Sequence, residues 1–282
     1  MSKTREFHRP EDWSEAHQLL SRSGIHTVPL AVSPRPTALD DLDADAFVDL
    51  EKLHLNYIKQ EEGLVHIGAL TTLQEIYLSD LIKSQAGGVL VKAAYLTATL
   101  GLRNLASLAG AITNPENPPE IALVLMTLDA VVTVQKDAWH TRQVALHEWM
   151  KDCGKVLLPG EAILEVSFKS QTSSQGAIAR VSRTPRDKAI VAAVAVLQVE
   201  AGVCKEAGLA LAGSNPVPVR LLDAEALFSG KQVNADLIAQ AAKLAVDQAA
   251  PVADYRGSVE YRKAMAGVLV KRALTQALDG QG

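Results

Sequence analysis

Histidine and cysteine are common metal ligands and catalytic residues. In this chain their spacing matches neither a zinc site nor an iron–sulfur site. None of the seven histidines stands in the His-Glu-x-x-His spacing that binds zinc. The two cysteines, Cys153 and Cys204, lie far apart, and an iron–sulfur cluster needs four ligands. No Gly-x-Ser-x-Gly elbow and no P-loop is present. The sequence therefore predicts no metal site of its own and gives no support to acyl or phosphoryl transfer.

Two segments each contain a glycine that suits a turn. Gly68 follows the apolar run at residues 64–67, and Gly110 closes the segment of residues 102–110, which also contains Ser107. Glycine adopts turn conformations that other residues avoid and lets the main chain approach a neighbouring group closely. Gly68 is interpreted as serving a backbone turn, and the residues alone give Ser107 and Gly110 an ordinary tight turn before a helix.

Three other polar residues are interpreted structurally. Arg103 and Asn104 suit a turn in which the asparagine bonds its own backbone. His66 alternates with apolar neighbours on a predicted strand, which favours a surface or partly buried side chain over a metal ligand.

Composition narrows the class of protein further. The chain has 282 residues, of which 48% are hydrophobic and 21% charged, and this balance is typical of a globular protein. The net charge of −4 and the low aromatic content of 4% argue against a nucleic-acid partner. The polar N-terminus has no signal-peptide pattern, and no apolar run is long enough to insert into a membrane. We therefore expect a cytoplasmic protein.

Hydrophobic periodicity and turn signals predict an α+β chain in three parts. The first, residues 1–57, is a small α/β lobe with a helix ending at Gly24 and strands at residues 27–32 and 46–50. The second, residues 58–172, is a central α+β lobe with strands at 64–67, 130–135 and 162–168 and helices at 73–84, 92–100, 121–128 and 144–150. The third, residues 173–282, combines a β-hairpin at 190–211 with helices at 235–246 and 258–274.

Several short motifs become specific when they are taken together in their order along the chain. They are residues 64–72, residues 102–110, the turn Leu128-Asp129-Ala130, residues 208–213, residues 216–220 with 225–227, and residues 255–262. In this order and spacing they cover nearly the whole chain. The sequence resembles the FAD-binding medium subunit of the xanthine dehydrogenase and carbon monoxide dehydrogenase (molybdopterin dehydrogenase) family.

The resemblance implies a fold, a cofactor and partners. The expected fold is a two-lobed FAD-binding domain of the PCMH-like type, followed by a C-terminal domain of antiparallel sheet plus helices. FAD would lie between the first two lobes. It would receive electrons from an iron–sulfur small subunit, which is reduced by a molybdopterin large subunit, and would pass them to NAD, quinone, oxygen or another carrier.

The same resemblance points to three flavin-binding segments. The first segment, Ala31, Val32 and Ser33, stands where the family has two glycines, and Pro34 and Pro36 beside it lack a backbone donor, although Arg35 offers a guanidinium. The second keeps a hydroxyl and one glycine of the family pattern, whereas the third is intact. The expected FAD contacts are Ala31, Val32, Ser33, Ile67, Gly68, Ala69, Thr71, Ser107, Ala109, Gly110 and Glu120, the last as an acidic acceptor for the ribose.

Two functions from different classes follow. The first is an FAD-binding electron-transfer subunit of a molybdenum hydroxylase type oxidoreductase complex. The second is a degenerate scaffold or interaction subunit that keeps the fold and binds no flavin. The altered first segment favours the second function, and the other two segments favour the first. The motif at residues 255–262 is interpreted either as a subunit contact or as the start of the last helix, with Ser258 as its N-cap.

Overall fold

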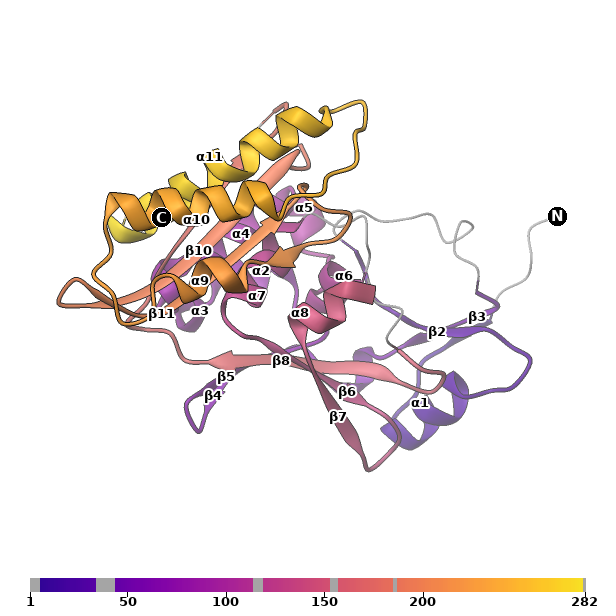
Figure 1. The fold of residues 1–282 in the computed structure, drawn as a ribbon. Helices are drawn as coiled ribbons and strands as arrows, with labels where there is room; N and C mark the ends of the chain where they lie inside the picture. The colour runs from indigo at the N-terminus through magenta and orange to yellow at the C-terminus, as the bar shows by residue number, and fades with distance from the viewer. Residues whose placement is uncertain (1–5, 34–43, 114–118, 153–156, 185–186, 281–282) are drawn as a thin grey trace.

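The computed structural model describes residues 6–33, 44–113, 119–152, 157–184 and 187–280. These residues form a small N-terminal lobe, a central lobe built on a sheet, and a C-terminal sheet covered by two long helices (Figure 1). The predicted α+β class is confirmed, including the antiparallel sheet plus helices at the C-terminal end. No helix in the described part of the chain is long and apolar enough to cross a membrane.

The described strands of the N-terminal lobe form a parallel sheet in which β3 lies between β1 and β2. The helix of this lobe begins at Asp12, whose side chain accepts the Glu15 N–H, and it buries Ala16 and Leu20 against the sheet. The predicted strand at residues 27–32 ends at Leu30, so the segment after it leaves the sheet. The elements are β1 (Glu6–His8), α1 (Trp13–Leu20), β2 (Thr27–Leu30), β3 (Ala46–Asp49) and a 3-10 helix (Glu51–Leu53).

The central lobe contains an antiparallel sheet in the order β4-β5-β8-β6-β7, with helices packed on one face. Its strands are β4 (Ile58–Glu61), β5 (Leu64–Gly68), β6 (Val131–Gln135), β7 (Thr141–Ala145) and β8 (Ala162–Lys169). Its helices are α2 (Leu73–Leu78), α3 (Asp80–Lys83), α4 (Val89–Thr97), α5 (Leu100–Arg103), α6 (Leu108–Thr113), α7 (Pro119–Thr127) and α8 (Leu146–Trp149), with 3-10 turns at Ala86–Gly88 and Met150–Asp152.

Two of the predicted helices differ in kind from those observed, and a third, predicted at 92–100, ends at Thr97 before the extended Ala98. The helix predicted at residues 73–84 is interrupted at Ser79, which has an extended backbone and ends α2 while its side chain caps α3. The helix predicted at 144–150 begins only at Leu146, because Val144 and Ala145 pair with Val132 and Val131 in the sheet. In the second case a tertiary strand pairing overrides a local helical pattern.

The C-terminal sheet has the order β12-β11-β10-β9, and the hairpin predicted at residues 190–211 is confirmed as β10 and β11. Its turn places Ala201 and Gly202 at φ values of 50° and 81°, the left-handed conformation that a two-residue hairpin turn requires. The elements are β9 (Gln175–Val181), β10 (Val191–Glu200), β11 (Val203–Ala212), β12 (Val219–Arg220), α9 (Leu222–Ala226), α10 (Ala235–Asp247) and α11 (Val259–Leu278).

Both faces of this sheet are buried, which explains why its strands are apolar at nearly every position. On β10, Val194 and Val196 belong to the core that the sheet shares with the central helices, including α7. The intervening Ala193 and Ala195 belong to a second core beneath α10 and α11 (Figure 1). The sheet therefore joins the C-terminal helices to the central lobe through two apolar layers.

A glycine on β11 sets how closely the central helix α7 can approach the sheet. A Cβ atom on Gly208 would lie 2.2 Å from the Thr127 carbonyl oxygen at the end of α7. We expect Gly208→Ala to lower the free energy of unfolding by about 1–3 kcal/mol, because the helix or strand must shift. In contrast, Gly101→Ala on α5 meets nothing within 4 Å and should stabilise the protein by about 0.5–1 kcal/mol. Urea denaturation measures both, and equal stability of the two variants would contradict the role of Gly208.

Candidate cofactor site

Main-chain hydrogen bonds bring together the three segments that were predicted to bind FAD. The Ser107 N–H donates to the Val32 carbonyl over 2.9 Å, which joins the second segment to the first. The Leu108 and Ala109 N–H groups donate to the carbonyls of Thr71 and Ala69, each over 2.9 Å, which joins the second segment to the third. The start of α6 therefore lies between the other two segments.

Gly110 is required by the packing of the first segment. A Cβ atom at this position would lie 2.1 Å from the Val32 carbonyl oxygen and 2.9 Å from the Ser33 nitrogen. The Ser107 hydroxyl accepts the Gly110 N–H over 3.2 Å and so stabilises the first turn of α6. These contacts confirm the turn interpretation of Ser107 and Gly110, and their cofactor contact stays a prediction.

The third segment is held by the end of β5. A Cβ atom on Gly68 would lie 2.2 Å from the Leu55 carbonyl oxygen, so only glycine allows this close approach. The Thr71 hydroxyl donates to the Tyr57 carbonyl over 2.9 Å and accepts the Tyr57 N–H over 3.1 Å. Ile67 is buried in the central core. These residues position Ala69 at the edge of a cavity.

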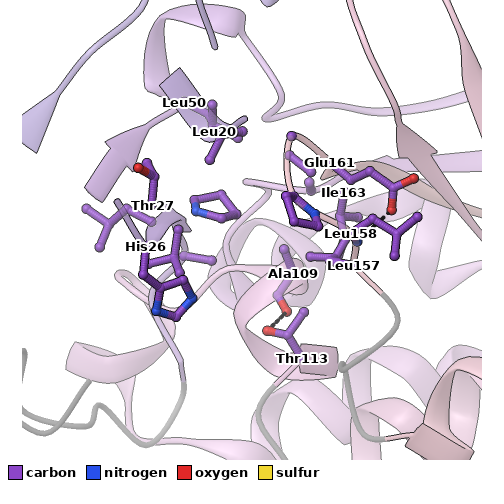
Figure 2. Close-up of a pocket in the computed structure, with 18 of the residues that line it drawn as sticks. Leu20, His26, Thr27, Leu50, Ala109, Thr113, Leu157, Leu158, Glu161 and Ile163 are labelled. Atoms are coloured by element: carbon purple, nitrogen blue, oxygen red, sulfur yellow. Dashed lines mark hydrogen bonds between the residues drawn. The ribbon is translucent and has the colours of Figure 1, made fainter. Parts of the chain in front are cut away.

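That cavity, of about 440 Å³, lies between the N-terminal and central lobes. Ala31, Ala69 and Ala109, one residue from each predicted segment, contribute to its wall. Figure 2 shows His26 and Thr27 of the N-terminal lobe on one side, and Leu157, Leu158 and Ile163 on the other. The lining is mostly apolar, with a few hydroxyl, imidazole and backbone groups and the charged residues Arg22 and Glu161, which is typical of a small-molecule site.

Glu120 lies elsewhere. Its side chain is buried at the start of α7, and its Oε1 lies 3.0 Å from Nη1 of Arg180 on β9. Glu120 does not line the cavity. Its predicted contact with a ribose therefore stays a prediction that this position does not support. The pair instead connects the central lobe to the C-terminal sheet.

The site can be tested for its fit to FAD. The cavity has the size and apolar character that the adenosine half of a dinucleotide needs. However, the five consecutive N–H groups of residues 107–111 already donate to the Val32, Thr71, Ala69 and Ser107 oxygens. The size and lining of the cavity thus fit part of FAD, but the N–H groups of the second segment are already used within the protein. Pro34, Arg35 and Pro36 lie outside the described residues.

The other polar residues singled out in the sequence have structural positions. Arg103 is buried at the end of α5, where its guanidinium packs against both the Tyr77 and the Tyr95 ring and donates to the Ala98 carbonyl. The predicted hydrogen bond of Asn104 to its own backbone stays a prediction. His66 is partly buried, as predicted, and its Nδ1 lies 2.9 Å from Glu165.

No group of three His, Cys, Asp or Glu side chains that could hold a metal ion occurs within the described ranges, where Cys204 is buried. Cys153 lies outside those ranges. The Glu165 carboxylate also accepts a hydrogen bond from the Tyr57 hydroxyl over 2.8 Å. Burial and this carboxylate raise the pKa of Tyr57 above its ordinary value.

Two sequence motifs meet in a charged cluster that local patterns did not predict. Asp129, in the turn after α7, pairs with Arg220 of β12, whose Nε donates to Glu225 over 2.8 Å. Glu225 also accepts the Leu209 N–H over 2.8 Å. Arg220 and Glu225 are about nine-tenths buried. These motifs therefore stabilise the junction between the central lobe and the C-terminal sheet, and no spacing rule connects residues 91 positions apart.

The motif at residues 255–262 ends in a buried arginine, Arg262, which with Asp254 forms the cluster called here the Arg262 cluster. Ser258 caps α11 by accepting the Tyr261 N–H, as predicted. Arg262 donates to the Ile190 and Gly213 carbonyls over 2.7 and 2.9 Å and to Asp254 over 2.6 Å. Its side chain is 5% exposed. The motif thus holds α11 against the start of β10.

Comparison with known proteins agrees with this architecture. Residues 3–168 match the FAD binding domain in molybdopterin dehydrogenase, and residues 177–277 match the CO dehydrogenase flavoprotein C-terminal domain. The chain therefore belongs to the family of FAD-binding medium subunits of molybdopterin dehydrogenases, as the sequence resemblance predicted.

Individual relatives have low sequence identity to this chain, but the similarity extends over most of both chains. The chain is 31% identical to the 6-hydroxypseudooxynicotine dehydrogenase complex subunit alpha of Paenarthrobacter nicotinovorans, over 82% of this chain and 79% of that one. It is 27% identical to the glyceraldehyde dehydrogenase medium chain of Sulfolobus acidocaldarius, over 83% and 84% of the two chains. A carbon monoxide dehydrogenase structure from Hydrogenophaga pseudoflava superposes with a TM-score of 0.89, at 26% identity and 99% coverage of both chains.

The ion pair of Asp254 with Arg262 in this cluster predicts that the free energy of unfolding depends on pH. Burial alone would raise the pKa of Asp254, but hydrogen bonds from Arg256 and Arg262 lower it far below its ordinary value. The contribution of Asp254 to stability is therefore complete above its unfolded pKa of about 3.9 and is lost as the pH falls through the lower folded pKa. We expect Asp254→Asn to cost about 1–3 kcal/mol at pH 7, because Arg262 loses its charged partner.

The measurement is urea denaturation of both proteins between pH 7 and pH 2. The difference between wild type and Asp254→Asn should shrink as the pH falls below about 4. Asp80→Asn is the matched control, since the Asp80 side chain is 94% exposed and solvent screens its pairing with Lys83, so that its difference from wild type should change much less with pH. A difference that stays constant with pH would contradict the role of the Asp254 carboxylate.

Proposed function

We propose that this chain is the FAD-binding electron-transfer subunit of a molybdenum hydroxylase type oxidoreductase complex. In this function it passes electrons from iron–sulfur clusters of a small subunit, reduced by a molybdopterin large subunit, to an external acceptor. The observation that supports it is the meeting of all three family segments at one cavity between the first two lobes. Relatives are named as medium chains or as a subunit of a dehydrogenase complex, which supports the partners.

The residues that would hold FAD follow from the geometry. The backbones around Ala31, Val32 and Ser33 would approach the pyrophosphate from one side, and the residues around Ser107, Ala109 and Gly110 from the other. Ala69 contributes to the cavity wall, while Ile67, Gly68 and Thr71 fix its position. Bound FAD supplies the redox chemistry of its flavin ring, and the protein binds it and excludes competing reactions.

A second function, a scaffold subunit that binds no flavin, is favoured by one specific observation. The N–H groups of residues 107–111 all donate within the protein, and the first segment carries Val32 and Ser33 where the family has glycines. We keep FAD binding as the primary function because the cavity persists in spite of these changes. We also propose the division into residues 1–57, 58–172 and 173–282 and a cytoplasmic location.

The first segment, which lacks the two glycines of the family pattern, predicts weak FAD binding by the isolated subunit. Hydrogen bonds to a charged group contribute about 1.5–3 kcal/mol each, so the loss of two weakens binding by roughly a hundredfold to ten-thousandfold. We expect the triple variant Val32→Gly, Ser33→Gly, Pro34→Thr to bind FAD more tightly than wild type. Val252→Gly, at an exposed position of the C-terminal part, is the control. Titration of apo-protein with FAD, followed by flavin fluorescence, measures all three.

The outcomes separate the two functions. Weak binding by wild type and tighter binding by the triple variant support the proposed function and the explanation of its weakness. Tight, stoichiometric binding by wild type would show that another surface holds the pyrophosphate. Absence of binding by both proteins would favour the scaffold.

The proposed partners give a further expectation. The proposed function takes its electrons from an iron–sulfur subunit, and within the described residues no group of three His, Cys, Asp or Glu side chains could hold a metal ion. We expect it to co-purify with an iron–sulfur subunit and a molybdopterin subunit when it is expressed in its native cells. Affinity purification with iron and molybdenum analysis tests this. An isolated monomer that is stable and catalyses substrate oxidation alone would contradict it.

A further inference from the structure

A second cavity, of about 590 Å³, lies between the central sheet and the C-terminal part of the chain. Its lining residues differ from those of the cavity between the first two lobes. Leu64 of β5, Val131 of β6 and Lys169 of β8 line its central side, and Lys205 of β11 and Leu222 of α9 line the opposite side. Sites for small molecules have volumes of roughly 300–1,000 Å³. The second cavity is therefore large enough for a ligand that contacts both parts of the chain.

Two hydrogen-bond donors lie side by side on the central wall. Ser167 and Lys169 are two residues apart on β8, so their side chains point to the same face of the sheet, and both line the second cavity. Ser167 is 7% exposed. Among the described residues, neither the Ser167 hydroxyl nor the Lys169 ammonium has a hydrogen-bond or ion-pair partner. The central wall thus offers a buried hydroxyl and a cation that the described chain leaves without an acceptor.

A β-bulge on the opposite wall directs a second lysine to the cavity. The pairing register of the β10–β11 hairpin skips Lys205, which makes it the extra residue of the bulge. Consecutive residues of a regular strand point to opposite faces, but Lys205, Glu206 and Ala207 all line the second cavity. The pair of Lys205 with Glu200 is long, at 4.0 Å, and solvent-exposed, so it holds the lysine weakly.

The acidic groups of the cavity are occupied or exposed to solvent. Asp129 and Glu225 both bind Arg220, which does not line the cavity. Glu206 is exposed, so water hydrates its carboxylate. The Ser167 hydroxyl differs from these groups because it is buried and its acceptor must come from a molecule inside the cavity. The unmet polar contact of the second cavity is therefore one that an acceptor of negative charge, placed between Ser167 and Lys169, would satisfy.

Apolar side chains lie beside these donors. Leu64 and Val131 line the cavity on the central side. On the opposite side, Leu222 at the start of α9 is 56% exposed and lines the same cavity. Covering such side chains with an apolar group removes their surface from water, which is favourable. A ligand that matches both features has an anionic group at one end and an apolar body at the other.

We propose that the second cavity binds a small monocarboxylate with an apolar body. The carboxylate accepts hydrogen bonds from the Lys169 ammonium and the Ser167 hydroxyl, and the apolar body packs against Val131 and Leu222. Because Leu222 belongs to α9 and Lys169 to β8, the ligand joins the C-terminal part to the central sheet. This site is independent of the flavin and does not rest on the proposed FAD-binding function.

Octanoate is the probe, and 1-octanol and octylammonium are the comparison ligands with the same tail and no charge or the opposite charge. Calorimetry on the full chain measures all three. We expect Lys169→Ala to weaken octanoate binding by about tenfold, because a charge-assisted hydrogen bond is lost, and to leave 1-octanol unchanged. Leu222→Ala should weaken octanoate and 1-octanol alike, through lost apolar contact. Lys271→Ala, which removes an exposed lysine of α11, is the matched control.

The outcomes decide the inference whether or not FAD binds. Thermal unfolding checks that each variant folds, and Lys169→Arg, which keeps the charge, should retain most of the affinity for octanoate. Octanoate that binds the cavity between the first two lobes instead would be insensitive to Lys169→Ala, and that result overturns the proposal. Equal affinity of wild type for octanoate and 1-octanol, or no binding of octanoate, overturns it as well. Flavin fluorescence titration of the same variants tests the proposed function separately, since Lys169→Ala should leave FAD binding unchanged.

Discussion

The approach of the Val32–Ser33 backbone to Gly110 is the contact on which the site depends. Any side chain at Gly110 would collide with the Val32 carbonyl, which itself accepts the Ser107 N–H. Through this contact the segment that leaves the N-terminal sheet is fixed against α6, and α6 is fixed against the segment after β5. The cavity between the lobes exists because these three segments are held together at one end while the turn at residues 157–161 closes the other side.

A second constraint joins the C-terminal part to this arrangement. The C-terminal sheet is apolar on both faces, and it packs against α7 on one face and against α11 on the other. Gly208 permits close packing against the end of α7, and the Arg220 cluster stabilises the same junction with charge. α7 also contacts α6, which carries the second cofactor segment. A shift of the C-terminal sheet against α7 would therefore also change the position of the cofactor segments.

The sequence predicted those features that local chemistry determines. The hairpin of β10 and β11 could be predicted because two long apolar runs flank Ala201 and Gly202, and the N-cap of α11 because Ser258 precedes a periodic segment. The three cofactor segments were located through their resemblance to a family. In contrast, the strand pairing of Val144 depends on Val132 of the neighbouring strand, and Ser79 caps α3 inside a segment with continuous helical periodicity, so local periodicity assigned both to helices.

Local sequence patterns could not predict the charged contacts of the site either, because these contacts join separate elements. Arg142 and Glu161 are separated by a strand, a helix and a turn, and only the fold places them 2.6 Å apart. Arg180 and Glu120 lie in different parts of the chain, and Glu120 pairs with Arg180 outside the cavity lining, whereas the family resemblance implied a ribose contact. Buried ion pairs of this kind carry no spacing signal, because their partners are selected by the packing of whole elements.

The glycines of the family pattern serve two requirements, close packing of the chain and access of a ligand to the backbone. In this chain only the glycines needed for packing are present. Gly110 and Gly68 are needed because the chain packs against itself: their missing Cβ atoms make room for the Val32 and Leu55 carbonyls. The glycines absent from the first segment would have served a ligand, since they would have opened the main chain to a phosphate. A chain can therefore retain the fold and the cavity of the family while its affinity for the cofactor changes, because the two properties depend on different glycines.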